Sequence, residues 1–273
     1  MGEHVVRATE SADRARLEEA LTRDEFVLFY QPKVDLRDGR VVGAEALIRW
    51  QHPERGLLAP GRFLPLIDDA DLAVAVGRWV ITAAVEQVGL WQADCLDIAV
   101  NVNLAARHLC APGFAEDVDA ALKAQPDVAA SMLELEVGEQ VALTDVAEIA
   151  EVIDACRLRG VRFALDDFGT GQTSLSRLRD LRVDTLKIDQ MLVRDMLDDA
   201  DSQAMVEGVI GLGRAFRRQV VAAGVETAAH CVALINLGCL VGQGYGIARP
   251  MPAAELADWV RSRPAAVGQG NQA

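Results

Sequence analysis

Short apolar runs and amphipathic segments alternate along this chain from about residue 26 onward. The apolar runs have the length and the Val, Ile and Leu content of buried strands. We predict eight strands: Phe26–Tyr30, Val41–Ile48, Ile98–Leu104, Leu133–Val137, Val161–Leu165, Thr185–Ile188, Gln219–Ala223 and Val241–Ile247. The segments between the later runs have helical periodicity, which predicts helices over Phe63–Gln87, Phe114–Lys123, Asp145–Arg159, Ser174–Leu181, Ser202–Phe216 and Ala228–Leu237.

The order of these elements predicts the fold class. Strand–helix alternation repeated to eight strands is typical of a closed, mostly parallel barrel. An open doubly wound sheet produces the same periodicity, so the pattern alone does not distinguish the two. The first two strands are joined by Asp35–Gly39, a hairpin signal, so that pair should be antiparallel. We therefore expect an α/β fold, a TIM-like (β/α)8 barrel with an antiparallel first strand, over residues 16–261, with a leader at 1–15 and a flexible tail at 262–273.

Composition narrows the classes of function. The 41 acidic and 27 basic residues give a formal net charge of −14, which argues against non-specific binding to nucleic acid or to an anionic membrane. Five scattered cysteines without a CxxC pair indicate a reduced, cytoplasmic protein, and four histidines without HxxxH or HxH spacing argue against zinc. The longest apolar stretch, Leu72–Val85, is broken by Arg78 and is too short to span a bilayer. A longer, membrane-anchored parent protein stays compatible with these features.

Two adjacent carboxylates, Asp166 and Asp167, follow the apolar run Val161–Leu165 and lead into Phe168–Gly171. They could close an Asx-type turn after a buried strand. Two negative charges at one strand end also suit the binding of divalent cations. This segment alone leaves both interpretations open.

Other predicted strands carry polar residues near their ends, namely Glu45, Asn103, Glu136, Lys187 and Gln243. Singly, the first three could be a solvated strand residue, a turn former and an exposed charge before a helix. Lys187 lies between Leu186 and Ile188, where a buried ammonium needs a counter-charge. The carboxyl ends of barrel strands meet on one face, where active sites form. Because Glu, Asn and Asp oxygens suit Mg²⁺ or Mn²⁺, we predict one metal site at this face.

Glu45-Ala46-Leu47 and its surroundings resemble the EAL phosphodiesterases, a family that hydrolyses cyclic di-GMP to the linear dinucleotide pGpG. The resemblance runs in order from about Arg16 to Val260. It rests on Tyr30–Pro32, Gly43–Trp50, Val102–Leu104, Glu134–Glu136, Asp166–Gly171, Asp184–Asp189, Gly224–Thr227 and Gln243–Tyr245.

This resemblance implies two divalent ions, Mg²⁺ or Mn²⁺, bridged by the substrate phosphate. Glu45, Asn103, Glu136 and Asp166 would hold one ion, and Asp166 with Asp167 the other. Lys187 would orient the attacking water, Glu139 would steady the Asp166–Gly171 loop, and Glu226 would keep a catalytic position of its own. Gln31, Leu47, Arg49 and Gln243 would line the dinucleotide cleft. The family also implies a homodimer formed near that loop, and fused sensory or cyclase domains in a parent protein.

One departure from the family pattern outweighs the others. The usual seventh-strand text is Val-Ala-Glu-Gly-Val-Glu-Thr, whereas this chain has Ala223 in place of the first glutamate. That glutamate is assigned in the family as general base or second-metal ligand, and loss of a general base lowers rates by about 10²–10⁴. Ala223 is compatible with a natural lesion that leaves a cyclic di-GMP receptor, with an engineered substitution, or with slow residual turnover. Gln172, Ala105 and Gln140 are lesser departures.

Two functions of different class therefore stay open: an impaired phosphodiesterase, and a binding module that senses cyclic di-GMP. An enolase-like enzyme fits less well, because Asn103 and the Asp166–Asp167 pair follow the EAL order. A purely structural barrel would leave Glu45, Asp166 and Lys187 without partners at the same mouth.

Overall fold

The computed structural model describes residues 14–67, 70–139, 146–169, 171 and 174–263. The predicted leader and tail therefore lie almost wholly outside the described residues, as do Gln140 and Gln172. The hairpin Asp35–Gly39 is present between two long strands, β1 (Phe26–Asp35) and β2 (Val41–His52), which pair in antiparallel fashion. This confirms the prediction made for the first strand pair.

Eight strands close into a barrel, which excludes the open doubly wound sheet. After β1 and β2 come β4 (Val100–Leu104), β5 (Leu133–Gly138), β6 (Arg162–Phe168), β7 (Thr185–Ile188), β8 (Gln219–Ala222) and β9 (Val241–Gly242). Neighbours from β2 to β9 are parallel, whereas β1 is antiparallel to both β2 and β9. Two short strands add to the sheet in antiparallel fashion: β3 (Gly56–Leu58) pairs with β2, and β10 (Met251–Pro252) pairs with β1.

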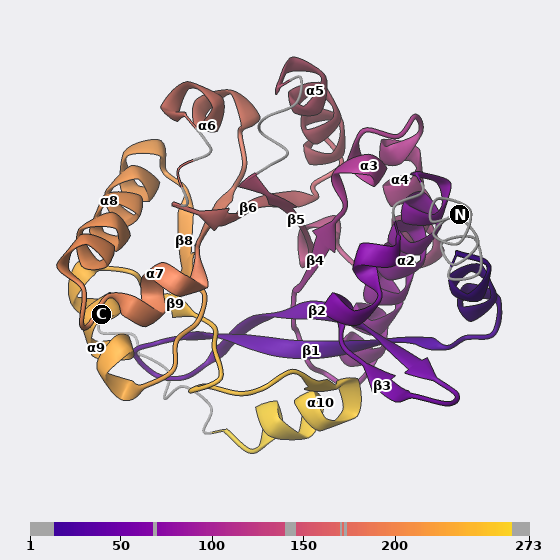
Figure 1. Ribbon diagram of the computed structural model, residues 1–273, viewed down its shortest axis with the longest axis horizontal. Coiled ribbons are helices and arrows are strands. Elements are labelled where there is room, and N and C mark those ends of the chain that lie inside the picture. Colours follow the sequence, from indigo (N-terminus) through magenta and orange to yellow (C-terminus); the bar gives the residue numbers. More distant parts are fainter. Residues whose placement is uncertain (1–13, 68–69, 140–145, 170, 172–173, 264–273) are drawn as a thin grey trace, which may run out of the picture.

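Helices lie around the outside of the barrel strands (Figure 1). They are α2 (Ala70–Ala93), α3 (Ala106–Leu109), α4 (Phe114–Ala124), α5 (Val146–Arg157), α6 (Leu175–Leu181), α7 (Gln190–Asp195), α8 (Ala200–Phe216), α9 (Ala228–Leu237) and α10 (Ala253–Arg261). Residues 14–22 are also helical, and three 3₁₀ turns are η1 (Pro60–Arg62), η2 (Leu64–Leu66) and η3 (Ala130–Met132). Side-chain caps begin several of them: Ser174, Asp199 and Thr227 accept hydrogen bonds from backbone N–H groups in the first turns of α6, α8 and α9.

The strands separate an apolar layer from a polar interior. On β5, Leu133, Leu135 and Val137 are buried and apolar, and they alternate with Glu134 and Glu136. Successive strand side chains point to opposite faces, so the two glutamates share one face. Both contact residues of β1 and β7, strands that do not neighbour β5 in the sheet. Such contacts are possible only across the barrel interior.

Some element boundaries differ from those predicted. β1 continues five residues past Tyr30, although Pro32 lacks a backbone N–H and prolines usually end central strands. α2 begins at Ala70 rather than Phe63, because a 3₁₀ turn that contains Pro65 occupies Leu64–Leu66. The predicted strand Val241–Ile247 is wrong beyond Gly242, where a turn forms and the Ile247 N–H donates to the Gly244 carbonyl. β3, β10, α3, α7 and α10 were not predicted.

One helix among the described residues, Asp71–Ala93, has the length and apolar composition to cross a membrane. It is longer than the apolar stretch considered from the sequence. In the fold, 44% of its most apolar window is buried, and α2 contacts β1, β4 and α4. A core helix passes the same test, so this finding is weak evidence for a membrane span.

We predict that Leu181→Ala lowers the free energy of unfolding by about 2–5 kcal/mol, because its side chain is completely buried and truncation leaves a cavity. Chemical denaturation monitored by circular dichroism measures the change. Leu158→Ala is the matched control: Leu158 is 90% exposed, and the same truncation should change stability by less than about 0.5 kcal/mol. Equal losses in both variants would contradict the assigned core.

Candidate active site

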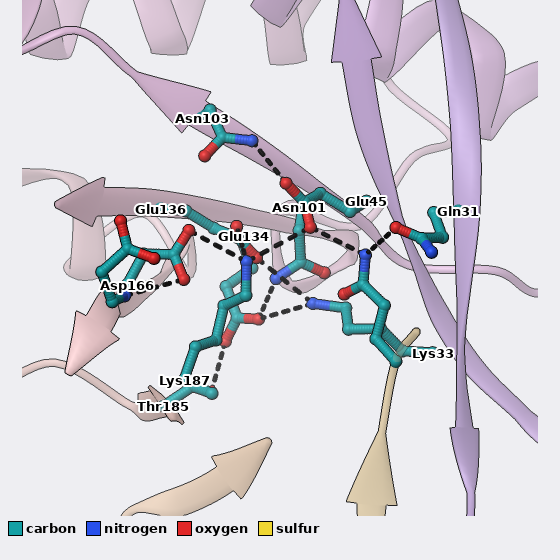
Figure 2. Close-up of polar contacts among 12 residues, drawn as sticks. Gln31, Lys33, Glu45, Asn101, Asn103, Glu134, Glu136, Asp166, Thr185 and Lys187 are labelled. Atoms are coloured by element: carbon teal, nitrogen blue, oxygen red, sulfur yellow. Dashed lines mark hydrogen bonds and ion pairs between the residues drawn. The ribbon is translucent and has the colours of Figure 1, made fainter. Parts of the chain in front are cut away.

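The Lys187 ammonium occupies the centre of the site, where three carboxylates from different strands converge (Figure 2). Its Nζ donates to Glu45 Oε2 at 3.2 Å, to Asp166 Oδ2 at 3.1 Å and to Glu136 Oε2. Lys187 and Glu136 are buried on β7 and β5, Glu45 is buried on β2, and Asp166 is half-buried on β6. Three donor hydrogens of one ammonium thus match three carboxylate partners.

Amide side chains hold the Glu45 carboxylate from both sides. Asn103 Nδ2 donates to Glu45 Oε1 at 2.6 Å, and Gln243 Nε2 donates to Glu45 Oε2 at 2.8 Å. Gln243 Nε2 also donates to Gln31 Oε1 at 2.9 Å, and Gln31 Nε2 donates to the Ala248 carbonyl. These contacts join β1, β2 and β9 where the antiparallel strand closes the barrel.

A cleft of about 380 Å³ opens above these residues, at the carboxyl ends of the parallel strands. Ten of the predicted residues line it: Gln31, Glu45, Leu47, Arg49, Asp166, Asp167, Lys187, Ala223, Glu226 and Gln243. Pro60, Gln190 and Tyr245 also contribute to its wall and were not singled out from the sequence. The predicted set is therefore brought together on one face.

Three predicted residues do not line this cleft. Glu136 is fully buried behind Lys187, and Asn103 faces an adjoining cavity of about 620 Å³ that also contains Glu45 and Leu47. Glu139 directly follows β5 and is buried. The Asp166–Gly171 loop that it was expected to steady includes residue 170, which lies outside the described residues. Its role therefore stays a prediction.

Asp167 has a left-handed backbone, with φ of 54°, which is uncommon for a non-glycine residue. Its N–H donates to Asp166 Oδ1 at 3.0 Å. This bond comes from the next residue, so it is not the Asx turn considered from the sequence, in which the N–H two residues on donates. It leaves Asp166 Oδ2 for Lys187. The two adjacent carboxylates consequently differ: Asp166 joins the central cluster, and Asp167 stands exposed at the rim of the cleft.

Ala223 lies just past the end of β8, one residue beyond the observed strand, with its methyl group on the cleft wall. Its N–H donates to the Ile188 carbonyl at 3.3 Å. The next residue, Gly224, has φ of 78°, and a Cβ there would lie 2.9 Å from Gln190 atoms. Glycine is thus required after position 223, which fixes the backbone that presents this side chain. Glu226 is exposed on the same cleft wall.

Sequence reasoning missed a second set of polar residues inside the barrel: Lys33, Asn101, Glu134 and Thr185. All four are buried, and each is two residues away from a residue that was predicted for the site. Asn101, Glu134 and Thr185 precede Asn103, Glu136 and Lys187 on parallel strands, whereas Lys33 follows Gln31 on the antiparallel strand. The period of two along each strand could have identified them.

Burial and neighbouring charges give the carboxyl groups of the site very different pKa values. Burial is the largest influence on Glu136 and, with the charges of Glu45 and Asp166, raises its pKa to about 7 despite Lys187. Burial also acts to raise the pKa of Glu45, but Lys187, Asn103, Lys33 and Gln243 outweigh it and bring this pKa to about 2. For Glu136, burial together with the two neighbouring carboxylates outweighs the lowering effect of the Lys187 and Lys33 ammonium groups, so its pKa is raised.

Burial and neighbouring charges also shift the pKa values of Asp167 and Lys187. Desolvation and the adjacent Asp166 charge raise the pKa of Asp167 to about 6. For Lys187, burial alone would lower the pKa, but three carboxylates raise it well above its usual value, so the side chain stays protonated. The site therefore combines a permanent cation with carboxylates that still carry excess negative charge.

The donor set fits a divalent cation. Oxygens of Glu45, Glu136 and Asp166 lie within 4.8 Å of one another, and the Asn103 amide stands beside Glu45. Carboxylate and amide oxygens are the ligands of hard cations such as Mg²⁺ and Mn²⁺.

The fold and the site define a class of protein: an α/β barrel with a carboxylate-rich, lysine-bridged cleft at the carboxyl ends of its strands. The sequence profile of the EAL domain family matches residues 14–250. The chain therefore belongs to the EAL domain family, which includes cyclic di-GMP phosphodiesterases.

Individual relatives agree with this assignment. The chain is 40% identical over 241 residues to the bifunctional diguanylate cyclase/cyclic di-GMP phosphodiesterase MucR of Pseudomonas aeruginosa, covering 88% of this chain and 35% of MucR. It is 38% identical over 240 residues to the cyclic di-GMP phosphodiesterase PA2567 of the same species, covering 88% and 41%. The solved structure of the PaMucR phosphodiesterase in complex with c-di-GMP has a TM-score of 0.85 and 39% identity, covering 90% of this chain and 99% of that one. The chain thus spans well under half of these two full-length relatives.

We predict that, with a chelator present, the melting temperature falls as the pH rises from about 5.5 to 8. Glu136 and Asp167 have pKa values of about 7 and about 6 in the folded state, above their usual 4.5 and 3.8. Their contribution to the free energy of unfolding is therefore fully present below the usual pKa values and is lost as the pH rises through about 6 to 7. The low pKa of Glu45 affects stability only below about 4.5 and lies outside this window. Differential scanning calorimetry measures the dependence.

Glu136→Gln should flatten this pH dependence, because the main titrating group is removed. Glu151→Gln on the exposed face of α5 makes the same charge change and should leave the slope as in the wild-type protein. If Glu136→Gln leaves the slope unchanged, the Glu136 carboxyl does not titrate in this pH range.

Proposed function

We propose that this domain binds cyclic di-GMP in the cleft and hydrolyses it slowly to linear pGpG. The observation that carries the proposal is the convergence of Glu45, Glu136 and Asp166 on one cation position beside a cleft lined by Gln31 and Arg49. Family membership and the likeness to a phosphodiesterase structure in complex with c-di-GMP support it. The net charge of −14 means that an anionic dinucleotide needs local positive charge to bind.

Mg²⁺ or Mn²⁺, when bound, would supply water activation and charge stabilisation for phosphodiester hydrolysis. Glu45, Asn103, Glu136 and Asp166 would hold one ion, and Asp166 with Asp167 would hold the other. The conformation of Asp167 favours this division, because it turns the adjacent carboxylates to different surroundings. In the reaction, water adds to phosphorus, one P–O bond to a ribose oxygen breaks, and that oxygen takes a proton.

The chain's own residues bind and orient the reactants. Lys187 lies at the base of the cleft and donates all three ammonium hydrogens to carboxylates. It would orient the attacking water once a bound cation held one of these carboxylates and freed a donor hydrogen. Gln243 Oε1 is buried and has no hydrogen-bond partner among the described residues, so it offers an acceptor to the substrate. The Arg49 guanidinium lies 5.5 Å from the Phe29 ring centroid and on the cleft wall, where it can meet a phosphate or a base.

Ala223 sets the expected rate. A methyl group on the cleft wall neither accepts a proton nor binds a cation, so the step assigned to the family's glutamate loses its group. Glu226 lies on the same wall but beyond Gly224, so it does not replace the missing carboxylate. The second candidate function, a cyclic di-GMP receptor, is favoured by this same observation, because the binding residues are intact. An engineered, substrate-trapping substitution would have the same structure.

The proposal extends to the surroundings of the domain. A homodimer near the Asp166–Gly171 loop is supported by Leu175 and Met191, large apolar side chains that are more than half exposed on α6 and α7. Fusion to sensory or cyclase domains is supported by the lengths of the relatives, because the chain matches only 35% of MucR and 41% of PA2567. All five cysteines are free, as in a protein of the reducing cytoplasm, where we place this domain.

We expect cyclic di-GMP to bind in the presence of Ca²⁺, used as a non-hydrolytic stand-in, and calorimetry should show the heat of binding. With Mn²⁺ and enzyme in excess over nucleotide, linear product should accumulate over hours above a metal-free blank, as measured by chromatography. Binding without product would favour the receptor, and the absence of binding in Ca²⁺ would reject both functions.

We expect Ala223→Glu to raise single-turnover hydrolysis by about 10²-fold or more, the range for a restored general base. Ala229→Glu, at an exposed position on α9, adds the same charge away from the cleft and should leave the rate unchanged. A rate unaltered by Ala223→Glu, in a variant that still binds nucleotide, would mean that another residue limits turnover.

A further inference from the structure

Beneath the central cluster, four polar side chains fill the barrel interior (Figure 2). We call Lys33, Asn101, Glu134 and Thr185 the inner layer; they come from β1, β4, β5 and β7. All four are buried, and none of them lines the cleft. A substrate in the cleft therefore does not touch them, and their role must act through the residues above.

Glu134 is the fixed point of the inner layer. Thr185 Oγ1 donates to its Oε1 at 2.6 Å, and Asn101 Nδ2 donates to its Oε2. The two donors come from strands on different sides of the barrel interior, so they define the plane of this carboxylate. Lys33 Nζ lies 3.8 Å from the same Oε2, so the ammonium is tied to an immobilised anion.

Lys33 then reaches up to the candidate metal ligand Glu136. Its Nζ donates to Glu136 Oε1 at 3.4 Å, whereas Lys187 donates to Glu136 Oε2. The two oxygens of this carboxylate are thus each held by a different lysine. Because Glu136 is completely buried, no bulk water competes for either oxygen.

We propose that Lys33 is a positioning residue for Glu136, and that Glu134, held by Asn101 and Thr185, fixes Lys33. This inference rests on the metal site proposed above. The positive charge of Lys33 and the negative charge of Glu134 cancel, so the pair leaves the net charge of the site unchanged and acts through geometry. Outer partners of metal ligands commonly act in this way, and their loss costs about 10- to 100-fold in metal affinity.

A charge-neutral double variant separates geometry from electrostatics. Lys33→Met/Glu134→Gln removes one positive and one negative charge and keeps both side-chain volumes. We expect its Mn²⁺ affinity, measured without nucleotide by electron paramagnetic resonance of the free ion, to fall about tenfold. Lys123→Met is the matched control, because Lys123 is exposed on α4 and pairs with Asp119 four residues earlier. The Mn²⁺ affinity of this variant should equal that of the wild-type protein.

The outcomes are distinguishable. If the wild-type protein binds Mn²⁺ and the double variant binds it within twofold, the proposed metal site stands and the positioning role is overturned, leaving Lys33 and Glu134 as a structural pair. If the wild-type protein does not bind Mn²⁺, the metal site fails, and the assignment of Lys33 fails with it.

If the double variant does not fold, Thr185→Val tests the same chain of contacts. It removes only the donor to Glu134 Oε1 and keeps the shape of the side chain. A lower Mn²⁺ affinity in folded Thr185→Val supports the proposal, and an unchanged affinity overturns it.

Discussion

The Lys187 ammonium is the interaction on which the barrel mouth depends. Oxygens of three carboxylates from β2, β5 and β6 lie within 4.8 Å of one another, and like charges at such separations repel strongly in a buried setting. One buried ammonium bonded to all three offsets this repulsion and joins β7 to the strands that carry them. The arrangement that stabilises the fold around a lysine is also an arrangement of oxygens suited to a divalent cation.

Strand direction organises the polar interior into layers. On the parallel strands β4, β5 and β7, the residue two places before each site residue belongs to the inner layer. On β1 the order is reversed, and Lys33 comes two places after Gln31. The antiparallel strand therefore contributes to both layers, and the Gln31–Gln243 hydrogen bond closes the barrel between β1 and β9.

Much of this architecture could be predicted from the sequence, because the informative signals are local. The apolar runs defined the barrel strands, and Asp35–Gly39 defined the hairpin. The motif residues around Glu45 and Asp166 identified the cleft. Lys33 was missed because the predicted strand ended at Tyr30, three residues before it, whereas β1 continues to Asp35. Glu134 and Asn101 were missed although the period of two places them on the same face as Glu136 and Asn103, because their partners lie on other strands, which a local pattern does not pair.

The end of β9 also differed from the prediction in a way that local pattern does not encode. Gln243 reads as part of a strand that continues to Ile247, but the chain turns after Gly242. Closely packed glycines explain the turn: a Cβ at Gly244 would lie 2.2 Å from the Val225 carbonyl oxygen. This contact joins the loop after β9 to the loop after β8. The two loops are separated by α9 in the sequence, so only the assembled barrel reveals the contact.

Position 223 is held by its backbone alone. Its N–H bonds to Ile188, Gly224 packs against Gln190, and the Ala223 methyl group takes no part in the hydrogen-bonded interior. The backbone conformation at this position is therefore set by the hydrogen bond to Ile188 and by Gly224, rather than by a polar contact of the side chain. Under the proposed function, one substitution at this position would exchange catalytic turnover for ligand capture while the backbone of the scaffold stays the same.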